Sequence, residues 1–455
     1  MGAPKDEKPL INLLRGWPHP SLLPVELVKR EPALLYAPDD GDLKLREELA
    51  KWLTDFYQPS NVAINRICIT GGASQSLGCI LQVFTEPVYT RNIWIVAPAY
   101  FLAFRMFQDN GFHDKMRAVP EDDEGIDIDF LRRELRKSEE RAEREGNNEP
   151  VHKRARPWSK IYRHILYAVP TFSNPTSKTW TMRRREEVVR LAREFDALVI
   201  TDDVYDMLQW STDRTAKQAQ LDKALMPRLV DIDSNLDGGA LRDGADGFGN
   251  AVSNGSFSKI AGPGLRTGWV EGTEKMAWGC SQVGTSRSGG APSQFTAAAV
   301  AEILATGELQ SYVLDVLQPS YAARYHTMMT AVEEHLLPLG LTLVQSDREV
   351  IGGYFIWLTL PSHIDAAVLA ETARTEENLL IGEGALFQVP GDTSDAVFAH
   401  SIRLCFAWED VDKLLPGVER LGRLIQSLIK DGTAGKMRQQ SEHDQEGKDP
   451  ISRYW

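Results

Sequence analysis

Short apolar runs rich in β-branched residues recur along the N-terminal part of the chain, and each ends in a turn rich in Gly, Pro or Asn. The runs cover residues 67–70 (ICIT), 93–97 (IWIVA), 165–169 (ILYAV) and 198–201 (LVIT). Between them lie helical patterns such as residues 182–197, where Val188, Leu191, Ala192 and Phe195 share one face and Arg183, Glu186, Glu187, Arg190 and Arg193 the other. This alternation predicts an α/β fold with a mostly parallel sheet flanked by helices.

A second pattern begins after residue 305. Helical periodicity over residues 309–337 is followed by two strand-like runs, 354–360 (YFIWLTL) and 401–406 (SIRLCF). We therefore expect an N-terminal arm over 1–37, a large domain over 38–305, a smaller α+β domain over 306–432 and a polar tail over 433–455.

Two charged stretches interrupt these patterns. Residues 138–160 are dense in Glu, Arg and Lys, and residues 233–250 are rich in Asp and Gly. Both compositions are typical of solvated insertions, so we predict that both stretches form surface loops.

Composition narrows the class of partner. The 455-residue chain carries a formal net charge of -13, which argues against binding to nucleic acid or to an anionic membrane. Its four cysteines are scattered, so neither a zinc site nor a disulfide framework is indicated. The polar N-terminus lacks the apolar core of a signal peptide, and no apolar run is long enough to cross a bilayer. We expect a cytoplasmic protein.

Polar and aromatic side chains follow the predicted strands, at the edge where open α/β sheets bind ligands. A small-residue turn, 71–76 (GGASQS), follows the first run and opens a helix, which suits a phosphate near Ala73 and Ser74. The later runs are followed by Tyr100, by Asn174, and by Asp202, Asp203 and Tyr205. Taken singly, each has an ordinary explanation as a core residue, a turn former or a helix cap.

One lysine stands in an unusual setting. Lys259 lies in the segment GSFSKIAGPGLRTGW (255–269), among small and apolar residues that indicate a buried or cleft-lining amine. An amine, a carboxylate, a phenol, an amide, a stacking ring, a phosphate-binding turn and a guanidinium are together the groups that pyridoxal phosphate requires. Lys259 would form the Schiff base, with its pKa lowered by burial and nearby positive charge, and Arg266 would hold phosphate oxygens.

The segments 256–259 (SFSK) and 263–266 (PGLR) resemble the lysine motif of the fold-type I pyridoxal-phosphate enzymes. The chain is most similar to class I/II aminotransferases of the kynurenine/α-aminoadipate and fungal aromatic subgroup, over residues 11–428. The resemblance implies that Lys259 also carries the proton between the substrate and the cofactor. It further implies that Asp202 pairs with the pyridine nitrogen, that Tyr205 and Asn174 hold the 3-oxygen, and that Tyr100 stacks on the ring.

The same resemblance assigns the phosphate to Ser256, Arg266, Ala73 and Ser74. The family often has Ser-Gln where this chain has Ala73-Ser74, so one side-chain contact to the phosphate does not carry over, and backbone amides remain for it. Tyr36, in the segment 35–41 (LYAPDDG), matches a tyrosine that in relatives reaches the phosphate of the neighbouring subunit. A homodimer is therefore implied.

The substrate side of the site is implied in the same way. Gly16 and Trp17, in the segment 15–18 (RGWP), match a pocket-lining segment, Asn174 also faces the substrate, and Arg403 stands where relatives bind the α-carboxylate. Trp17 indicates an apolar or aromatic side chain, although a packing role explains it equally well. Arg403 has an alternative role in a structural ion pair.

The resemblance implies a ping-pong transamination between an L-amino acid and a 2-oxo acid. The alternative is β-elimination, such as cleavage of a carbon–sulfur bond in a cysteine conjugate, which needs the same lysine, aspartate and arginine. A regulator that fuses this domain to a DNA-binding arm is not expected, because barely ten residues precede the first matching motif and the chain is acidic.

Overall fold

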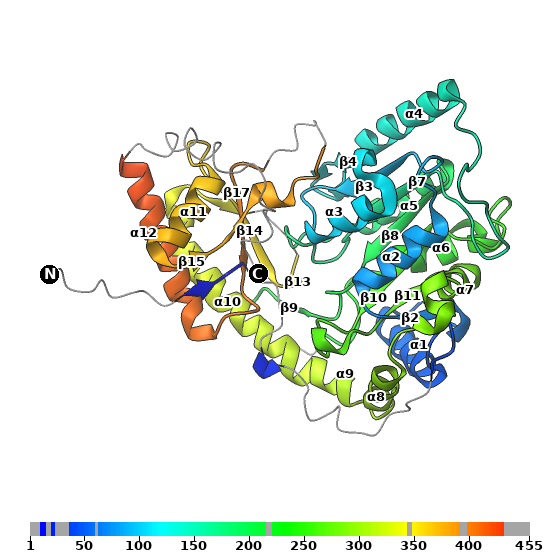
Figure 1. The fold of residues 1–455 in the computed structure, drawn as a ribbon. Helices are drawn as coiled ribbons and strands as arrows, with labels where there is room; N and C mark the ends of the chain where they lie inside the picture. The colour runs from blue at the N-terminus through cyan, green and yellow to red at the C-terminus, as the bar shows by residue number, and fades with distance from the viewer. Residues whose placement is uncertain are drawn as a thin grey trace.

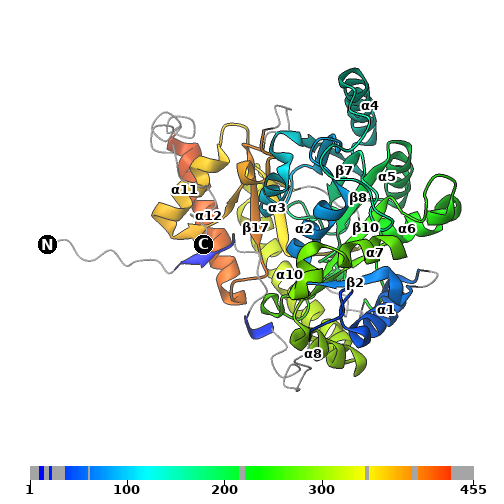
Figure 2. The same ribbon diagram turned by 45° about the vertical axis from the view of Figure 1, so that its right-hand side comes forward.

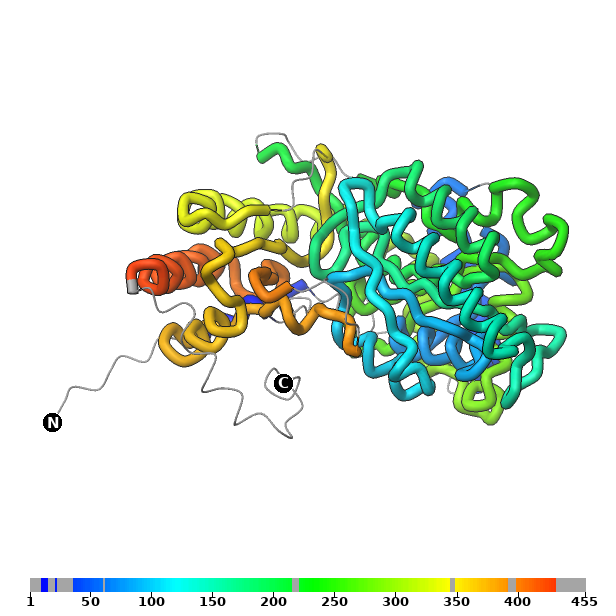
Figure 3. The backbone as a smooth tube through the Cα atoms, turned by 90° about the horizontal axis from the view of Figure 1, so that it is seen from above, coloured from blue at the N-terminus to red at the C-terminus, as the bar shows by residue number. Residues whose placement is uncertain are grey.

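The computed structural model describes residues 10–14, 20–22, 36–59, 62–214, 221–343, 348–391 and 398–431. Within them the chain forms two lobes, a larger one around the main sheet and a smaller one built from the C-terminal part (Figure 1). Seen from above, the two lobes lie side by side (Figure 3). Gly16, Trp17 and the expected polar tail lie outside the described residues.

The large lobe is built on a seven-stranded sheet in the order β2-β11-β10-β8-β7-β3-β4. Its strands are β2 (Ile67–Thr70), β3 (Asn92–Val96), β4 (Met116–Val119), β7 (His164–Ala168), β8 (Ala197–Asp202), β10 (Ala251–Ser256) and β11 (Gly268–Glu271). Only β11 runs antiparallel to its neighbours. The predicted, mostly parallel sheet is confirmed, and each of the four predicted runs agrees with its strand to within one residue.

Helices cover both faces of this sheet. They are α1 (Leu43–Tyr57), α2 (Ala73–Phe84), α3 (Leu102–Phe107), α4 (Ile128–Glu145), α5 (Met182–Glu194), α6 (Leu229–Asn235), α7 (Glu274–Ser281) and α8 (Gln294–Ala305). Successive residues of β3 point to opposite faces, so Ile93 and Ile95 join one apolar cluster while Trp94 and Val96 join another. Burial on both faces explains why these strands read as continuous apolar runs.

The prediction for residues 138–160 is wrong at its start, because residues 138–145 continue α4, which ends at Gly146 in the left-handed conformation. This helix projects from the large lobe in two views (Figures 1 and 2). Its capping residue Asp127 accepts a hydrogen bond from the amide of Phe130, and Leu131 and Leu135 anchor its first half. The charged residues 138–145 therefore form part of a helix rather than a loop.

The prediction for residues 233–250 is also wrong in part, because Asp233 belongs to α6 and is 3% exposed. Its carboxylate accepts hydrogen bonds from Arg193 and from the amides of Asn250 and Ala251. Arg193, which the helical pattern of α5 placed on the solvated face, is thus turned inward by a partner that the pattern does not reveal.

The small lobe packs three long helices against a four-stranded antiparallel sheet, β12-β14-β17-β16. Its strands are β12 (Thr342–Leu343), β14 (Phe355–Thr359), β16 (Gly382–Glu383) and β17 (Ser401–Cys405), and its helices are α10 (Gln318–His335), α11 (Ala366–Glu377) and α12 (Val411–Asp431). The short helix α9 (Glu308–Tyr312) leads into α10.

Two short strand pairs join distant parts of the chain. β1 (Ile11–Asn12) lies parallel to β15 (Leu379–Leu380) in the small lobe. β9 (Gln209–Ser211), which lies between β8 and β10 in the chain, runs antiparallel to β13 (Val350–Gly352). No helix of the described residues is long and apolar enough to cross a membrane.

Candidate active site

Four of the predicted site residues come together where the carboxyl ends of the parallel strands face the small lobe. Asp202 ends β8, Lys259 follows β10, and Asn174 follows β7, whereas Arg403 comes from β17 of the small lobe. The guanidinium of Arg403 donates a 2.9 Å hydrogen bond to the side-chain oxygen of Asn174, which joins the two lobes directly.

Lys259 lies in a tight turn after β10. The amides of Ile260, Ala261 and Gly262 all donate to the carbonyl of Phe257, and the hydroxyl of Tyr354 donates to the carbonyl of Lys259 at 3.2 Å. Burial lowers the pKa of the Lys259 amine to about 8, with a smaller contribution from the charge of Arg403 and against the opposing effects of Cys405 and Asp202. An appreciable fraction of this amine is therefore neutral near neutral pH.

Asp202 presents one satisfied oxygen and one unsatisfied oxygen. Its Oδ2 accepts a 3.0 Å hydrogen bond from the hydroxyl of Tyr167, but its buried Oδ1 has no hydrogen-bond partner among the described residues. Burial raises the pKa of Asp202 to about 7. A protonated pyridine nitrogen would satisfy Oδ1 and, as a cation, would lower this pKa again. This acceptor fits pyridoxal phosphate.

Tyr167 is a site residue that the sequence reasoning missed. It stands one position before Ala168, which pairs with Thr201 in the neighbouring strand, and this register brings Tyr167 beside Asp202. Its signal was a tyrosine inside an otherwise aliphatic run. Asp203, by contrast, accepts hydrogen bonds from the hydroxyls of Thr201 and Ser253.

A second cradle forms at the start of α2. Gly72 has φ +101°, and a Cβ there would lie 2.8 Å from Nη2 of Arg266, which donates to the carbonyl of Gly71. Ser256 and Ser258 share a 2.9 Å hydrogen bond next to this guanidinium. Ala73 and Ser74 open the helix. Helix amides, a guanidinium and two hydroxyls suit a phosphate dianion.

Arg403 is held between aromatic rings and is 3% exposed. Its guanidinium carbon lies 4.1 Å from the ring centroid of Phe355 and 4.7 Å from that of Phe387. One Nη donates to Asn174 and the other to the carbonyl of Leu14, while Nε has no partner among the described residues. Burial lowers the pKa of Arg403 to about 10. A planar cation with an open N–H suits a carboxylate.

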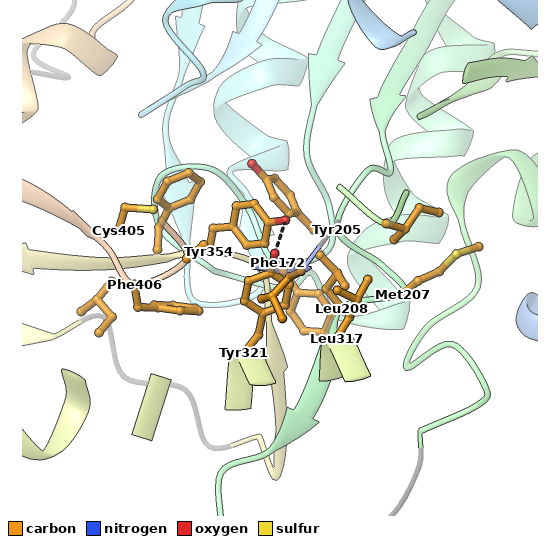
Figure 4. Packing of buried hydrophobic residues seen from close by; sticks show 14 of the residues in the cluster. Phe172, Tyr205, Met207, Leu208, Leu317, Tyr321, Tyr354, Cys405 and Phe406 are labelled. Atoms are coloured by element: carbon orange, nitrogen blue, oxygen red, sulfur yellow. Dashed lines mark hydrogen bonds between the residues drawn. The ribbon is translucent and has the colours of Figure 1, made fainter. Parts of the chain in front are cut away.

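Of the remaining predicted residues, Tyr205 and Tyr100 lie near the site, whereas Tyr36 lies on the surface. Tyr205 is buried, and its ring meets that of Tyr354 edge-on at 5.3 Å (Figure 4). Burial, with a smaller contribution from the nearby charge of Asp202, raises the pKa of Tyr100 to about 12. Tyr36 instead stands on the surface, 86% exposed and beside Gly289.

Comparison with known proteins agrees with this geometry. The family described as aminotransferase class I and II matches residues 20–421. An uncharacterized protein of Saccharomyces cerevisiae is 32% identical over 92% of this chain and 97% of its own length. An aromatic-amino-acid aminotransferase of Thermococcus litoralis is 26% identical over 92% of this chain and 89% of its own length. The crystal structure of a kynurenine aminotransferase of Pyrococcus horikoshii, which contains the pyridoxamine form of the cofactor, superposes with a TM-score of 0.71 at 27% identity, covering 92% of this chain and 91% of that one. The chain therefore belongs to the class I and II aminotransferases, pyridoxal-phosphate-dependent enzymes of fold type I.

Proposed function

We propose that this aminotransferase moves an amino group from an L-amino acid with an aromatic or apolar side chain to a 2-oxo acid, in two half-reactions at one site. The observation that carries the proposal is the meeting of the Lys259 amine, the unsatisfied oxygen of Asp202 and the Arg403 guanidinium at one edge of the sheet. These groups supply a base, a partner for the cofactor and an anchor for the substrate.

Each residue has a distinct task in this proposal. Pyridoxal phosphate, held by Asp202, Ser256 and Arg266, would supply an aldehyde for the substrate nitrogen and an electron-withdrawing ring that weakens the bond between Cα and its hydrogen. The Nζ atom of Lys259 accepts the proton from Cα, and a pKa of about 8 allows it to give that proton up again. Arg403 fixes the α-carboxylate, and Asn174 orients Arg403 through the hydrogen bond between them.

The preference for an aromatic or apolar side chain rests on two supports. Phe355 and Phe387 flank the arginine proposed to hold the substrate, so apolar surface surrounds the anchor. Two of the similar proteins are named for aromatic substrates, an aromatic-amino-acid aminotransferase and a kynurenine aminotransferase.

The proposal includes a homodimer in the cytoplasm. Tyr36 is 86% exposed in one chain and lies beside Gly289, and such exposure would leave it available to complete a partner's phosphate cradle. All four cysteines are free and buried, which accords with a reducing compartment.

Acceptor dependence tests the proposed reaction. Purified enzyme loaded with cofactor is mixed with a panel of amino acids, and the 2-oxo acid formed is measured with and without an added 2-oxo acid. Turnover that requires the acceptor, fastest with aromatic or apolar donors and abolished in Lys259→Ala, is the expected result. Release of ammonia and pyruvate from a cysteine conjugate without acceptor would instead establish β-elimination.

A further inference from the structure

Two buried tyrosines lie directly behind the Lys259 turn. Tyr354, between β13 and β14, donates its hydroxyl proton to the carbonyl of Lys259 at 3.2 Å. The hydroxyl of Tyr321, on α10, lies 3.1 Å from the hydroxyl of Tyr354, and the two point toward one another (Figure 4). Both side chains are fully buried, so this short chain of hydroxyls is shielded from water.

The direction of the chain follows from its chemistry. A tyrosine hydroxyl has one proton, and the carbonyl of Lys259 can only accept. Tyr354 therefore donates its hydrogen bond to the carbonyl of Lys259, and Tyr321 must donate its own hydrogen bond to the hydroxyl oxygen of Tyr354. Tyr321 thus acts on Lys259 only through Tyr354.

Tyr354 is itself held by contacts of its neighbouring backbone with both lobes. Gly352, in β13, passes so close to the loop after Tyr205 that a Cβ would lie 2.1 Å from the carbonyl of Leu208. Gly353 then takes φ +81°, which favours glycine, and the carbonyl of Tyr354 accepts from the amide of Phe406. The ring of Tyr354 lies 5.4 Å from the Lys259 nitrogen, so its face attracts the charged form of the amine.

We propose that Tyr354 and Tyr321 are positioning residues that hold the main chain of Lys259 still while its side chain moves the proton in both half-reactions. The inference rests on the proposed role of Lys259. A base that shuttles a proton between two carbon atoms must return to the same geometry at each transfer, and a hydrogen bond to its own carbonyl fixes the point about which the side chain swings.

Removing one hydroxyl at a time tests whether these two hydrogen bonds position Lys259. Tyr354→Phe keeps the ring and deletes the bond to Lys259, so kcat is expected to fall about tenfold while KM changes less than about twofold. In the cofactor-free protein, amide hydrogen exchange in residues 257–262 should become faster. Tyr321→Phe should show the same two changes to a smaller extent, and the double variant should be no worse than Tyr354→Phe alone.

Tyr325→Phe is the matched control. Tyr325 lies one turn further along α10, where its ring packs against Trp210 and Phe406, and this variant should change neither kcat nor exchange in the turn. Unchanged kcat and unchanged exchange in a folded Tyr354→Phe protein would overturn the inference, as would additive losses in the double variant. If Tyr354→Phe does not fold, Tyr321→Phe decides by the same two measurements. Failure of the proposed function would appear separately, as full amino transfer by Lys259→Ala.

Discussion

Burial acts in opposite directions on the two central ionisable residues. It lowers the pKa of Lys259 to about 8 and raises that of Asp202 to about 7, because a poorly hydrated site disfavours either charge. In the proposed reaction each shift serves a function at a cost in stability, because a less basic amine can act as a base and a protonated carboxyl can ionise beside a positively charged partner. The cost in stability of burying these two groups is therefore greatest when no cofactor is bound.

The cost at Asp202 predicts a pH-dependent stability. The unfolded chain ionises this carboxyl near pH 3.8, but the folded protein does so near 7, so the folded state loses stability as pH rises between these values. Cofactor-free Asp202→Asn should be more stable than the parent at pH 8, by roughly 2–4 kcal/mol, and the difference should shrink toward pH 5. Urea unfolding at both pH values measures it, and the exposed Asp243→Asn serves as control. A variant that is less stable than the parent at pH 8 would contradict this account.

At the scale of elements, the start of α2 shows how backbone conformation prepares a binding site. The turn before the helix needs a left-handed residue at Gly72, and the missing side chain leaves room for the Arg266 guanidinium. The phosphate cradle therefore requires that residue 72 has no Cβ atom.

Gly72→Ala should therefore weaken cofactor binding. A side chain at this φ costs about 1–2 kcal/mol and displaces Arg266, so the dissociation constant for pyridoxal phosphate should rise about tenfold or more. Fluorescence titration of the cofactor-free protein measures it. Gly78→Ala, inside the same helix where nothing lies within 4 Å of a new Cβ, should leave the affinity unchanged and stabilise the protein by about 0.5–1 kcal/mol.

The junction between α5 and α6 offers a test of the buried aspartate. Asp233→Ala removes the partner of Arg193 and the acceptor for two amides, and should lower the free energy of unfolding by about 3 kcal/mol. Asp243→Ala, in the same stretch but exposed, should change it by less than about 0.5 kcal/mol. Chemical denaturation compares the two. Equal, small effects would mean that Asp233 is solvated after all.

These elements also show where sequence reasoning succeeds and where it stops. Four strands were predictable because burial on both faces demands unbroken apolar runs, and their ends pointed to Asn174 and Asp202. Lys259 was instead recognised by the small and apolar residues around it in the sequence. Burial of Asp233 was not predictable, since its partner Arg193 lies on another helix and only packing brings them together. The contacts of Tyr321 and Tyr354 were not predictable for the same reason, because packing brings these two residues of the small lobe against Lys259 of the large one.

At the scale of the whole molecule, the site belongs to neither lobe alone. Arg403 of the small lobe reaches Asn174 of the large lobe, and the β9–β13 pair ties the two lobes together nearby. A homodimer in which Tyr36 reaches the partner would extend this sharing across chains.

Mixing two defective variants tests that sharing. In a hybrid of Lys259→Ala and Tyr36→Ala subunits, the site that keeps Lys259 would receive an intact Tyr36 from its partner. Unfolding and refolding the two variants together should therefore give more activity than the mean of the variants refolded separately. Activity equal to that mean would show that Tyr36 serves its own chain.

The pairing of β1 with β15 bears on how the protein is made. Ile11 and Asn12 lie against Leu379 and Leu380, and the carbonyl of Leu13 accepts from the amide of Cys405. A ribosome releases the first of these segments long before it synthesises the last. Residues 11–13 must therefore remain without their partners until residues 379–405 have been synthesised, and the part of the candidate site that carries Arg403 can form only then.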